Sequence, residues 1–394
     1  MTKKRSRRTT AGKSGRKGAI STGGVIILLL LLGTLFAADR LGIVDIDWET
    51  LFNGGNVSDS ISTPAATPVR VEPVSGEWYR LYFTSPQYPD VPATRHQTIT
   101  SGLIDVINKT QRSLDIAIYE LNLDEIGDAI LAARDRGVNV RIVTDTDEIE
   151  ELETLIRLND EGIPIVPDER SAIMHNKFMV VDGQAVWTGS WNFTPNDTYR
   201  NNNHGIYIQS PELARNYATE FEEMFSDRAF GPTSPANTPL PQIIIGDTLI
   251  ETCFAPEDHC AEKLIETINQ AQQTIRFMAF SFTHDDIGQA ILDKAKSGLD
   301  VKGVFETRGS ETEFSEYGRM KNQGLDVWQD GNPYTLHHKV VIIDGQMVAS
   351  GSFNFSANAT ESNDENLIII HNPEIAQQFL AEFERVYAQA QQSQ

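Results

Sequence analysis

The chain has 394 residues, 40% of them hydrophobic and 22% charged, which suits a globular protein long enough for two domains with cores. Its formal net charge is −22, although residues 1–38 hold eight basic side chains and no acidic one. Nucleic-acid-binding proteins usually present a broad basic face. The acidic remainder therefore argues against general capture of DNA or RNA, while a local positive site for an anionic substrate stays open.

The N-terminal region predicts a membrane anchor followed by a spacer. Residues 1–18 form a basic tail, and residues 19–38 form an uncharged run. Twenty helical residues span about 30 Å, the thickness of a bilayer core. A cleaved signal peptide is the alternative, but Leu35 and Phe36 fit poorly at the −3 position of a cleavage site. We expect a single-pass cell-membrane protein with its N-terminus in the cytoplasm, its catalytic part outside, and a flexible linker at 39–76.

From about Trp78 the sequence is globular and repeats itself. Each half is predicted to run helix, strand, helix, strand, helix, strand, then the motif strand and more strands, and to end in a helix. The first four elements lie at 103–108, 114–119, 126–131 and 138–143, and at 264–269, 275–280, 287–292 and 299–305. This alternation predicts an α/β fold with two similar halves, 77–230 and 243–394, each with a mixed central sheet. A Pro-rich linker, 231–242, joins them, and a pseudo-twofold axis would bring equivalent segments face to face.

Two cysteines lie in the second half, Cys253 and Cys260. They are either unrelated thiols or, if this part of the chain is exported, a short-loop disulfide. Their spacing is not one of the usual zinc spacings, and the sequence shows no Asp, Glu and His set spaced for another metal.

The strongest signal is a motif that occurs twice, His-x-Lys-x4-Asp-Gly followed by Gly-Ser-x-Asn. The first copy supplies His175, Lys177, Asp182, Ser190 and Asn192, and the second supplies His337, Lys339, Asp344, Ser352 and Asn354. Equivalent residues are 162 positions apart throughout. One copy arises easily by chance, whereas two copies with the same downstream segment at the same distance do not.

The motif residues suit phosphodiester chemistry. Residues 173–181 and 335–343 are predicted strands, on which the His and Lys of each copy share a face. The Asp-Gly turns then return the Ser and Asn side chains toward that face. Lys, Ser and Asn would stabilise charge on phosphoryl oxygens, a neutral His would attack phosphorus, and a protonated His would supply a proton to the leaving oxygen. With lysines neutralising the charge, such a site would require no metal or other cofactor.

The doubled pattern resembles the HKD signature of the phospholipase D superfamily over about residues 78–390. The resemblance implies two αβ sandwich halves, one active site at their interface and a covalent phosphohistidine intermediate. It also implies that Asp182 and Asp344, although part of the catalytic motif, are more structural than catalytic.

The family often places a carboxylate shortly after the Gly-Ser-x-Asn segment to hold the motif histidine. Glu365 fits this role in the second half, and Asn203 is its equivalent in the first. We therefore expect His337 to have a carboxylate partner and His175 an amide. A carboxylate raises the pKa of a histidine, so His175 is predicted to be the nucleophile and His337 the general acid. The opposite assignment stays open, because a carboxylate also strengthens a histidine in Ser-His-Asp systems.

The positions of four further side chains are predicted from weaker sequence signals. His204 adjoins Asn203 and is expected to be a polar group at a strand end, with a place in the site as the alternative, while His338 should face away from the site. Tyr119 and Phe280 end matched strands and are expected in the core.

The predicted function is hydrolysis of phospholipid phosphodiesters at a membrane surface by a single chain that carries both half-sites. Three alternatives are a metal-independent nuclease of the same superfamily, a phosphatidyl transferase resembling cardiolipin synthase, and a non-catalytic envelope binding module. The intact His and Lys pairs argue against the binding module.

Overall fold

The computed structural model describes residues 69–71, 78–95 and 97–393. The predicted basic tail and membrane anchor lie outside the described residues, as does most of the predicted spacer. Within the described part of the chain, no helix combines the length and apolar character needed to cross a bilayer.

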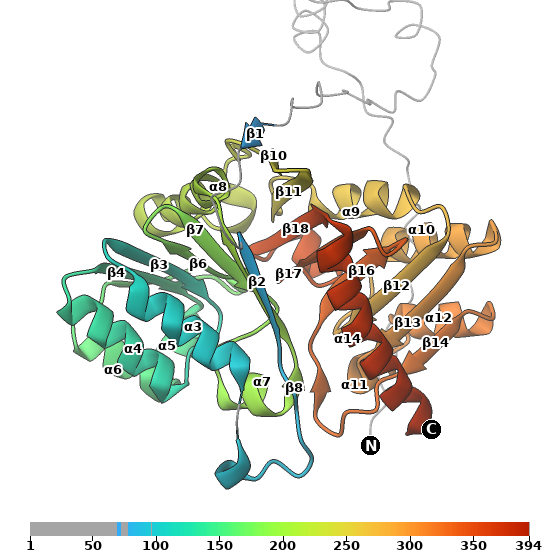
Figure 1. Cartoon of the computed structure of the whole chain (residues 1–394), viewed down its shortest axis with the longest axis horizontal. Coiled ribbons are helices and arrows are strands. Elements are labelled where there is room, and N and C mark those ends of the chain that lie inside the picture. The colour runs from blue at the N-terminus through green and yellow to red at the C-terminus, as the bar shows by residue number, and fades with distance from the viewer. Residues whose placement is uncertain (1–68, 72–77, 96, 394) are drawn as a thin grey trace, which may run out of the picture. The chain divides into compact units, whose positions relative to one another are not determined.

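The first half is built on a seven-stranded mixed sheet (Figure 1). Its strands, in spatial order, are β2 (Tyr79–Phe83), β9 (His204–Gln209), β7 (Ala185–Gly189), β6 (Lys177–Val181), β3 (Ser113–Ile118), β4 (Asn139–Thr144) and β5 (Ile165–Pro167). Strands β3, β4 and β5 are parallel, and the remaining neighbours are antiparallel. The larger helices of this half are α3 (Thr98–Lys109), α4 (Asp124–Asp135), α6 (Glu153–Asp160) and α8 (Pro211–Glu222). Shorter helical segments are η1 (Pro92–Thr94), α5 (Thr146–Ile149), α7 (Pro195–Tyr199), η2 (Glu223–Asp227) and η3 (Gly231–Thr233).

The second half repeats this plan on a nine-stranded sheet. Its spatial order is β1 (Val69–Val71), β10 (Gln242–Ile245), β11 (Thr248–Ala255), β18 (Glu365–His371), β17 (Met347–Gly351), β16 (Lys339–Ile343), β12 (Thr274–Ala279), β13 (Asp300–Phe305) and β14 (Asp326–Gln329). Its helices are α9 (Cys260–Asn269), α10 (Asp285–Lys296), α11 (Thr307–Ser310), α12 (Glu316–Asn322), α13 (Ala357–Glu361) and α14 (Pro373–Gln392). Strand β1 falls inside the predicted spacer and pairs in parallel with β10.

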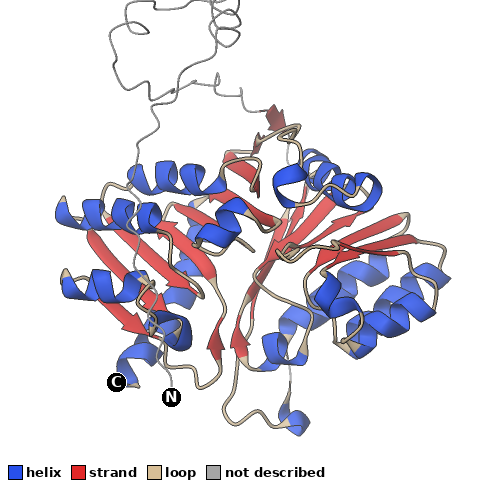
Figure 2. Ribbon diagram, turned by 180° about the vertical axis from the view of Figure 1, so that it is seen from behind, coloured by secondary structure: helices blue, strands red, loops and turns tan. Residues whose placement is uncertain are grey.

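The two sheets stand side by side and share a core (Figure 2). One buried cluster combines residues of both halves, including Phe178 and Val180 of β6, Val340 and Ile342 of β16, and residues of α8 and α14. Each half also has a buried cluster of its own, which lies between its sheet and the helices other than α8 and α14. The predicted α/β fold with two similar mixed-sheet halves is confirmed.

The motif strands begin later than the sequence predicts. They were expected from residues 173 and 335, but β6 begins at Lys177 and β16 at Lys339. The preceding segments pair with the opposite half instead. His175 N–H donates to Asp364 O at 3.0 Å, and His337 N–H donates to Asn202 O at 3.0 Å. The predicted continuous strands are therefore wrong at their first residues, because the interface takes the backbone hydrogen bonds there.

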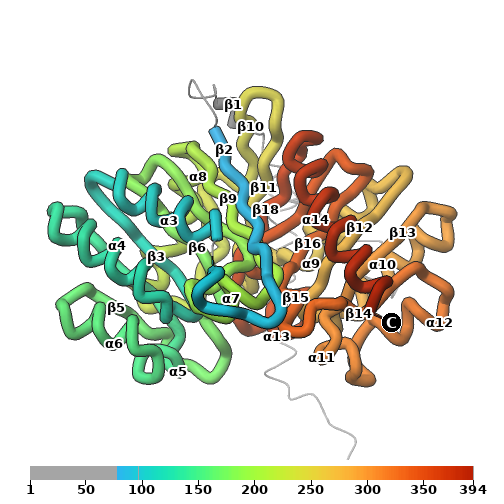
Figure 3. Tube along the Cα trace, turned by 60° about the horizontal axis from the view of Figure 1, so that its bottom comes forward, coloured from blue at the N-terminus to red at the C-terminus, as the bar shows by residue number. Residues whose placement is uncertain are grey.

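A short ladder joins the halves beside the second motif. Strand β15 (Thr335–Leu336) pairs in parallel with β8 (Asn201–Asn202) of the first half, which follows α7. Figure 3 shows β15 beside α7. The equivalent contact on the other side is the bridge between Met174 and Asp364. The ladder and the bridge each hold one motif histidine against the opposite half.

Cys253 on β11 and Cys260 at the start of α9 form a disulfide. The alternative of two unrelated thiols does not apply. The bridge ties the last residues of a central strand to the helix that covers the second sheet.

Candidate active site

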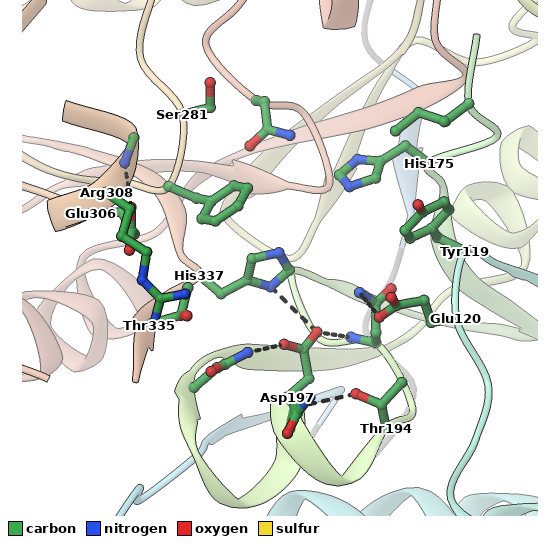
Figure 4. A pocket seen from close by; sticks show the side chains of 17 residues that line it. Tyr119, Glu120, His175, Thr194, Asp197, Ser281, Glu306, Arg308, Thr335 and His337 are labelled. Atoms are coloured by element: carbon green, nitrogen blue, oxygen red, sulfur yellow. Dashed lines mark hydrogen bonds and ion pairs between the residues drawn. The ribbon is translucent and has the colours of Figure 1, made fainter. Parts of the chain in front are cut away.

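Both motif histidines face one cavity of about 710 Å³ between the halves (Figure 4). The first half contributes His175, Asn192 and Asp197, and the second contributes Phe280, His337 and Asn354. Both histidines are almost fully buried, with exposed fractions of 5% for His175 and 7% for His337. The sequence-predicted composite site is thus assembled from two segments that lie 162 residues apart.

The supporting partners are exchanged between the halves. Glu365 was expected to hold His337, but its Oε2 atom lies 2.8 Å from Nδ1 of His175. The same oxygen accepts a hydrogen bond from Ser352 Oγ at 2.6 Å. The predicted pairing is wrong because the motif segments cross the interface, which places each histidine next to the other half's supporting residue.

His337 is held in the corresponding way by the first half. Its Nδ1 lies 2.9 Å from Oδ1 of Asn203, which also accepts from Ser190 Oγ at 2.8 Å. A carboxylate is present here too, since Asp197 Oδ2 lies 3.4 Å from the same nitrogen. In both rings the Nδ1 atom is engaged, so Nε2 is the nitrogen left to act on a substrate.

The motif lysines are buried beside the histidines. Lys177 Nζ donates to the backbone oxygen of His175 at 2.9 Å, and Lys339 Nζ donates to that of His337 at 2.9 Å. Burial lowers the pKa of Lys177 to about 8. Burial and the charge of Lys177 hold the pKa of Lys339 well below its usual range. A phosphodiester bound between the two lysines would favour their ammonium forms, so the pair is a preorganised site for an anion.

The same burial keeps both histidines neutral. Burial, followed by the positive charges of Lys177 and Lys339, holds the pKa of His175 well below its usual range. Burial and the two lysines act on the pKa of His337 in the same direction. A neutral imidazole carries the lone pair that nucleophilic attack requires.

The two motif asparagines line the cavity as predicted. Asn192 Nδ2 donates to Glu120 Oε2 at 3.1 Å. The Oδ1 atoms of Asn192 and Asn354 are buried and find no hydrogen-bond partner within the described residues. Most buried polar atoms have a hydrogen-bond partner, so these two acceptors are available to a donor group that enters the cavity.

The motif aspartates do not reach the cavity. Asp182 and Asp344 sit at the far ends of β6 and β16, where both have a φ of +54° in the Asp-Gly turns. Asp344 accepts backbone N–H groups of Gln272, Gln273 and Thr274 at 2.7–2.8 Å. Asp182 does the same for residues 111–113. Their inclusion in the catalytic set is corrected: they anchor the hairpin to the start of the neighbouring strand.

Sequence reasoning missed four residues of the cavity wall. Tyr119 and Phe280 do not pack in the core, since their rings lie 5.4 Å from His175 and 4.7 Å from His337. Glu120 and Asp197 were not singled out at all, and burial raises the pKa of Glu120 to about 7. The sequence held a usable signal for Tyr119, Glu120 and Phe280. These three residues directly follow parallel strands, and the carboxyl ends of parallel strands usually border the site.

His204 and His338 belong to a layer that does not line the cavity. Their Nδ1 atoms lie 3.0 Å apart, both rings are fully buried, and His338 Nε2 lies 3.2 Å from Glu382 Oε1. His338 turns away from the site as expected, and His204, the first residue of β9, is the predicted polar group at a strand end and does not line the cavity.

One group of described carboxylates approaches closely enough to hold a cation: Glu220, Glu223 and Glu257, whose oxygens lie within 4.8 Å of one another. None of the three lines the catalytic cavity. Burial raises the pKa of Glu257 to about 8 and that of Glu223 to about 7. Protons therefore neutralise much of this group near neutral pH.

Two pseudosymmetric αβ halves, with paired histidines and buried lysines at one shared cavity, define a phosphodiesterase of the two-motif type. The sequence matches the family described as cardiolipin synthase, PLD-like domain, at residues 103–225 and 264–387. The chain belongs to this phospholipase D family, as its motifs predict.

Each of the following two relatives matches less than half of the chain. It is 30% identical to a phospholipase D of Rickettsia typhi, over 45% of this chain and 83% of the relative. It is 27% identical to a mitochondrial cardiolipin hydrolase of Chlamydomonas reinhardtii, over 32% of this chain and 56% of the relative. Among solved structures, a phosphatidylserine synthase of Haemophilus influenzae has a TM-score of 0.61 at 14% identity and covers 79% of this chain and 86% of its own, a likeness of fold.

Replacing Asp344 by Asn tests the structural role of the motif aspartate. The substitution keeps a residue that tolerates positive φ but removes the charge that receives three N–H groups, so we expect a loss of about 1 kcal/mol in unfolding free energy. The rate constant kcat should stay within about twofold, because the side chain is remote from the histidines. Urea unfolding and steady-state assays measure the two effects, with Glu384→Ala on the exposed face of α14 as control. A large loss of kcat in a stable variant would restore Asp344 to the catalytic set.

The pKa shifts of Glu223 and Glu257 predict a loss of stability as pH rises. Folding raises both pKa values above the ordinary 4.5, so the native state binds protons more tightly. Their contribution is complete below pH 4.5 and is lost through pH 7–8. Glu223→Gln/Glu257→Gln should therefore flatten the decline of Tm between pH 5 and pH 8. An unchanged slope in thermal melts would exclude these two groups as its source.

Proposed function

We propose that the chain hydrolyses phospholipids at their phosphodiester bonds outside the cytoplasm, held at the membrane by residues 19–38 and working as a single chain. The observation that carries the proposal is the composite cavity, where two imidazoles with engaged Nδ1 atoms meet two buried lysines. The disulfide between Cys253 and Cys260 supports a location outside the reducing cytoplasm. The acidic chain, with a net charge of −22, favours a lipid over a nucleic acid.

His175 is the proposed nucleophile, on grounds different from those in the sequence. Glu365 accepts its Nδ1–H, which directs the Nε2 lone pair toward the cavity and stabilises the positive charge that develops on the ring. Nε2 attacks phosphorus, the bond from phosphorus to the headgroup oxygen breaks, and His337 gives its Nε2 proton to that oxygen. Lys177 and Lys339 stabilise the phosphoryl oxygens throughout.

Hydrolysis of the intermediate reverses these roles. Water attacks the phosphorus of the phosphohistidine, His337 takes the proton of that water, and the bond from phosphorus to His175 breaks. The products are phosphatidic acid and the headgroup alcohol. The negative charge of a bound phosphodiester offsets the two ammonium groups, which makes it easier for His337 to carry a proton in the complex. Asp197, 3.4 Å from its Nδ1, acts in the same direction.

An activated substrate separates the two histidines. A p-nitrophenolate leaving group needs no acid, so His337→Asn should still form the intermediate from bis(p-nitrophenyl) phosphate but hydrolyse it slowly. We expect a burst of about one p-nitrophenol per chain and a label on His175 in peptide mapping. His175→Asn should give no burst. A label on His337, or a burst from His175→Asn, would reverse the assignment.

Substrate class and metal independence are tested together. The purified full chain in detergent micelles is assayed with EDTA on phosphatidylcholine, cardiolipin and single-stranded DNA, with glycerol added in a parallel series to detect transfer in place of hydrolysis. We expect turnover of lipid that EDTA does not reduce, and little cleavage of DNA. Preferred cleavage of DNA would favour the nuclease alternative, and glycerol adducts as the main product would favour a transferase. Activity lost on chelation would contradict the metal-free mechanism.

A further inference from the structure

A smaller recess of about 180 Å³ opens beside the catalytic cavity. It is lined by Asn196, Arg200, Asn201, Arg308, Tyr334 and Thr335. Four of these also line the catalytic cavity: Asn196, Asn201, Arg308 and Thr335. The recess is therefore an extension of the active site.

Two arginines from opposite halves converge on this recess. The guanidinium of Arg200 lies 5.6 Å from the ring centre of Tyr334, and Arg308 Nη2 donates to the backbone oxygen of Tyr334 at 3.1 Å. Thr335, on the ladder that joins the halves, precedes His337 by two residues, or about 7 Å of extended chain. Figure 4 shows Arg308 and Thr335 on the side of His337 that faces away from Tyr119 and His175.

The recess carries an excess of positive charge in an acidic chain. Asp90 is shared between Arg95, with Nη2 at 2.6 Å, and Arg200, with Nε at 2.9 Å. Glu306, the acid next to Arg308 in the lining of the cavity, accepts the N–H of Gly309 at 2.6 Å. The lining of the recess itself holds two guanidinium groups and no carboxylate, and Arg308 is exposed.

The internal repeat shows that the fold does not require these residues. The equivalents of Arg200, Arg308 and Tyr334 in the opposite half are Ser362, Asp147 and Ala172. The mirror position thus has neither the two arginines nor the aromatic ring. The pair of arginines with the tyrosine ring therefore occurs on one side of the active site. On the other side Arg170 donates to the backbone oxygen of Ser362 at 2.9 Å and is paired with Asp364 at 3.1 Å.

We propose that Arg200 and Arg308 form a second phosphate subsite, which binds the second phosphodiester of a lipid that carries two while the first lies between the motif lysines. The inference rests on the proposed function and names its substrate class. Guanidinium forks bind phosphate oxygens in pairs, and Thr335 adds a hydroxyl between the two positions. A lipid with two phosphodiesters joined by a three-carbon bridge has the required chemistry.

Exposed apolar side chains beside the recess favour a lipid over an oligonucleotide. Tyr88 is 69% exposed and Val91 45% exposed, and both flank Asp90. The Tyr88 ring lies 5.5 Å from that of Tyr334, and Asp90 N–H donates to Tyr334 Oη at 2.8 Å. A loop that exposes two apolar side chains next to a basic recess is suited to contact acyl chains while phosphates enter the site.

The test compares lipids with one and two phosphodiesters. The full chain in mixed micelles is assayed on cardiolipin and phosphatidylglycerol, with bis(p-nitrophenyl) phosphate as a soluble probe of the catalytic centre. Arg308→Gln should lower the ratio of kcat/KM for cardiolipin to kcat/KM for phosphatidylglycerol about tenfold. Arg215→Gln, an exposed arginine on α8, is the matched control. Arg200→Gln should act in the same direction, and retained activity on the soluble probe verifies its fold.

Direct binding gives a second measurement. Deacylated cardiolipin is titrated by calorimetry into His175→Asn, with and without Arg308→Gln, and the arginine substitution should weaken binding about tenfold. Equal losses on both lipids, or unchanged binding, would overturn the subsite. A loss seen with a short oligonucleotide but not with cardiolipin would overturn the lipid assignment. Absence of turnover of every phosphodiester by the unmodified chain would instead reject the proposed function, and the calorimetric arm would still decide the subsite.

Discussion

Each motif histidine is oriented by a residue of the other half, and the active site depends on this exchange. Glu365 reaches His175 at 2.8 Å and Asn203 reaches His337 at 2.9 Å, so neither half holds a complete catalytic group. The exchange has a backbone cause, because the segment before each motif strand pairs across the interface. The shared core beneath α8 and α14 keeps the halves in one register. Packing, backbone pairing and catalysis are therefore coupled at the same surface.

Burial of charge at this interface follows from what the site must bind. Lys177 and Lys339 are nearly inaccessible, which lowers their pKa values, while burial raises the pKa of Glu365 to about 8. Such groups oppose folding unless they compensate one another. In the free site Glu365 and Asp197 raise the pKa values of both lysines and so oppose the effect of burial, and a bound phosphodiester would add a further anion in the same direction. The free energy needed to bury and orient these charges is spent when the protein folds, before substrate binds. Preorganised donors stabilise a transition state in this way.

The sequence predicted the halves, the order of elements and the motif residues, because repeats and hydrophobic periodicity are local and regular. It did not predict which half supports which histidine, since Glu365 and Asn203 follow their own motifs in the chain and only the crossing of the interface reassigns them. It also placed Tyr119 in the core, because a residue that ends a buried strand looks the same in sequence whether it meets a neighbour or a cavity. Asp197 was missed for a third reason: its equivalent is Ala359, so a search for repeated residues passes over it.

That last omission points to how the two halves divide the work. Residues common to both halves build the phosphoryl centre, where the reaction is nearly symmetric between formation and hydrolysis of the intermediate. Residues found in one half only lie around this centre. Asp197 lies beside His337, and its equivalent in the other half is Ala359. Arg308 lies at the neighbouring recess, and its equivalent is Asp147. A substrate has two different ends, whereas a duplicated fold offers two similar walls. Discrimination between those ends must therefore come from positions where the repeat has diverged.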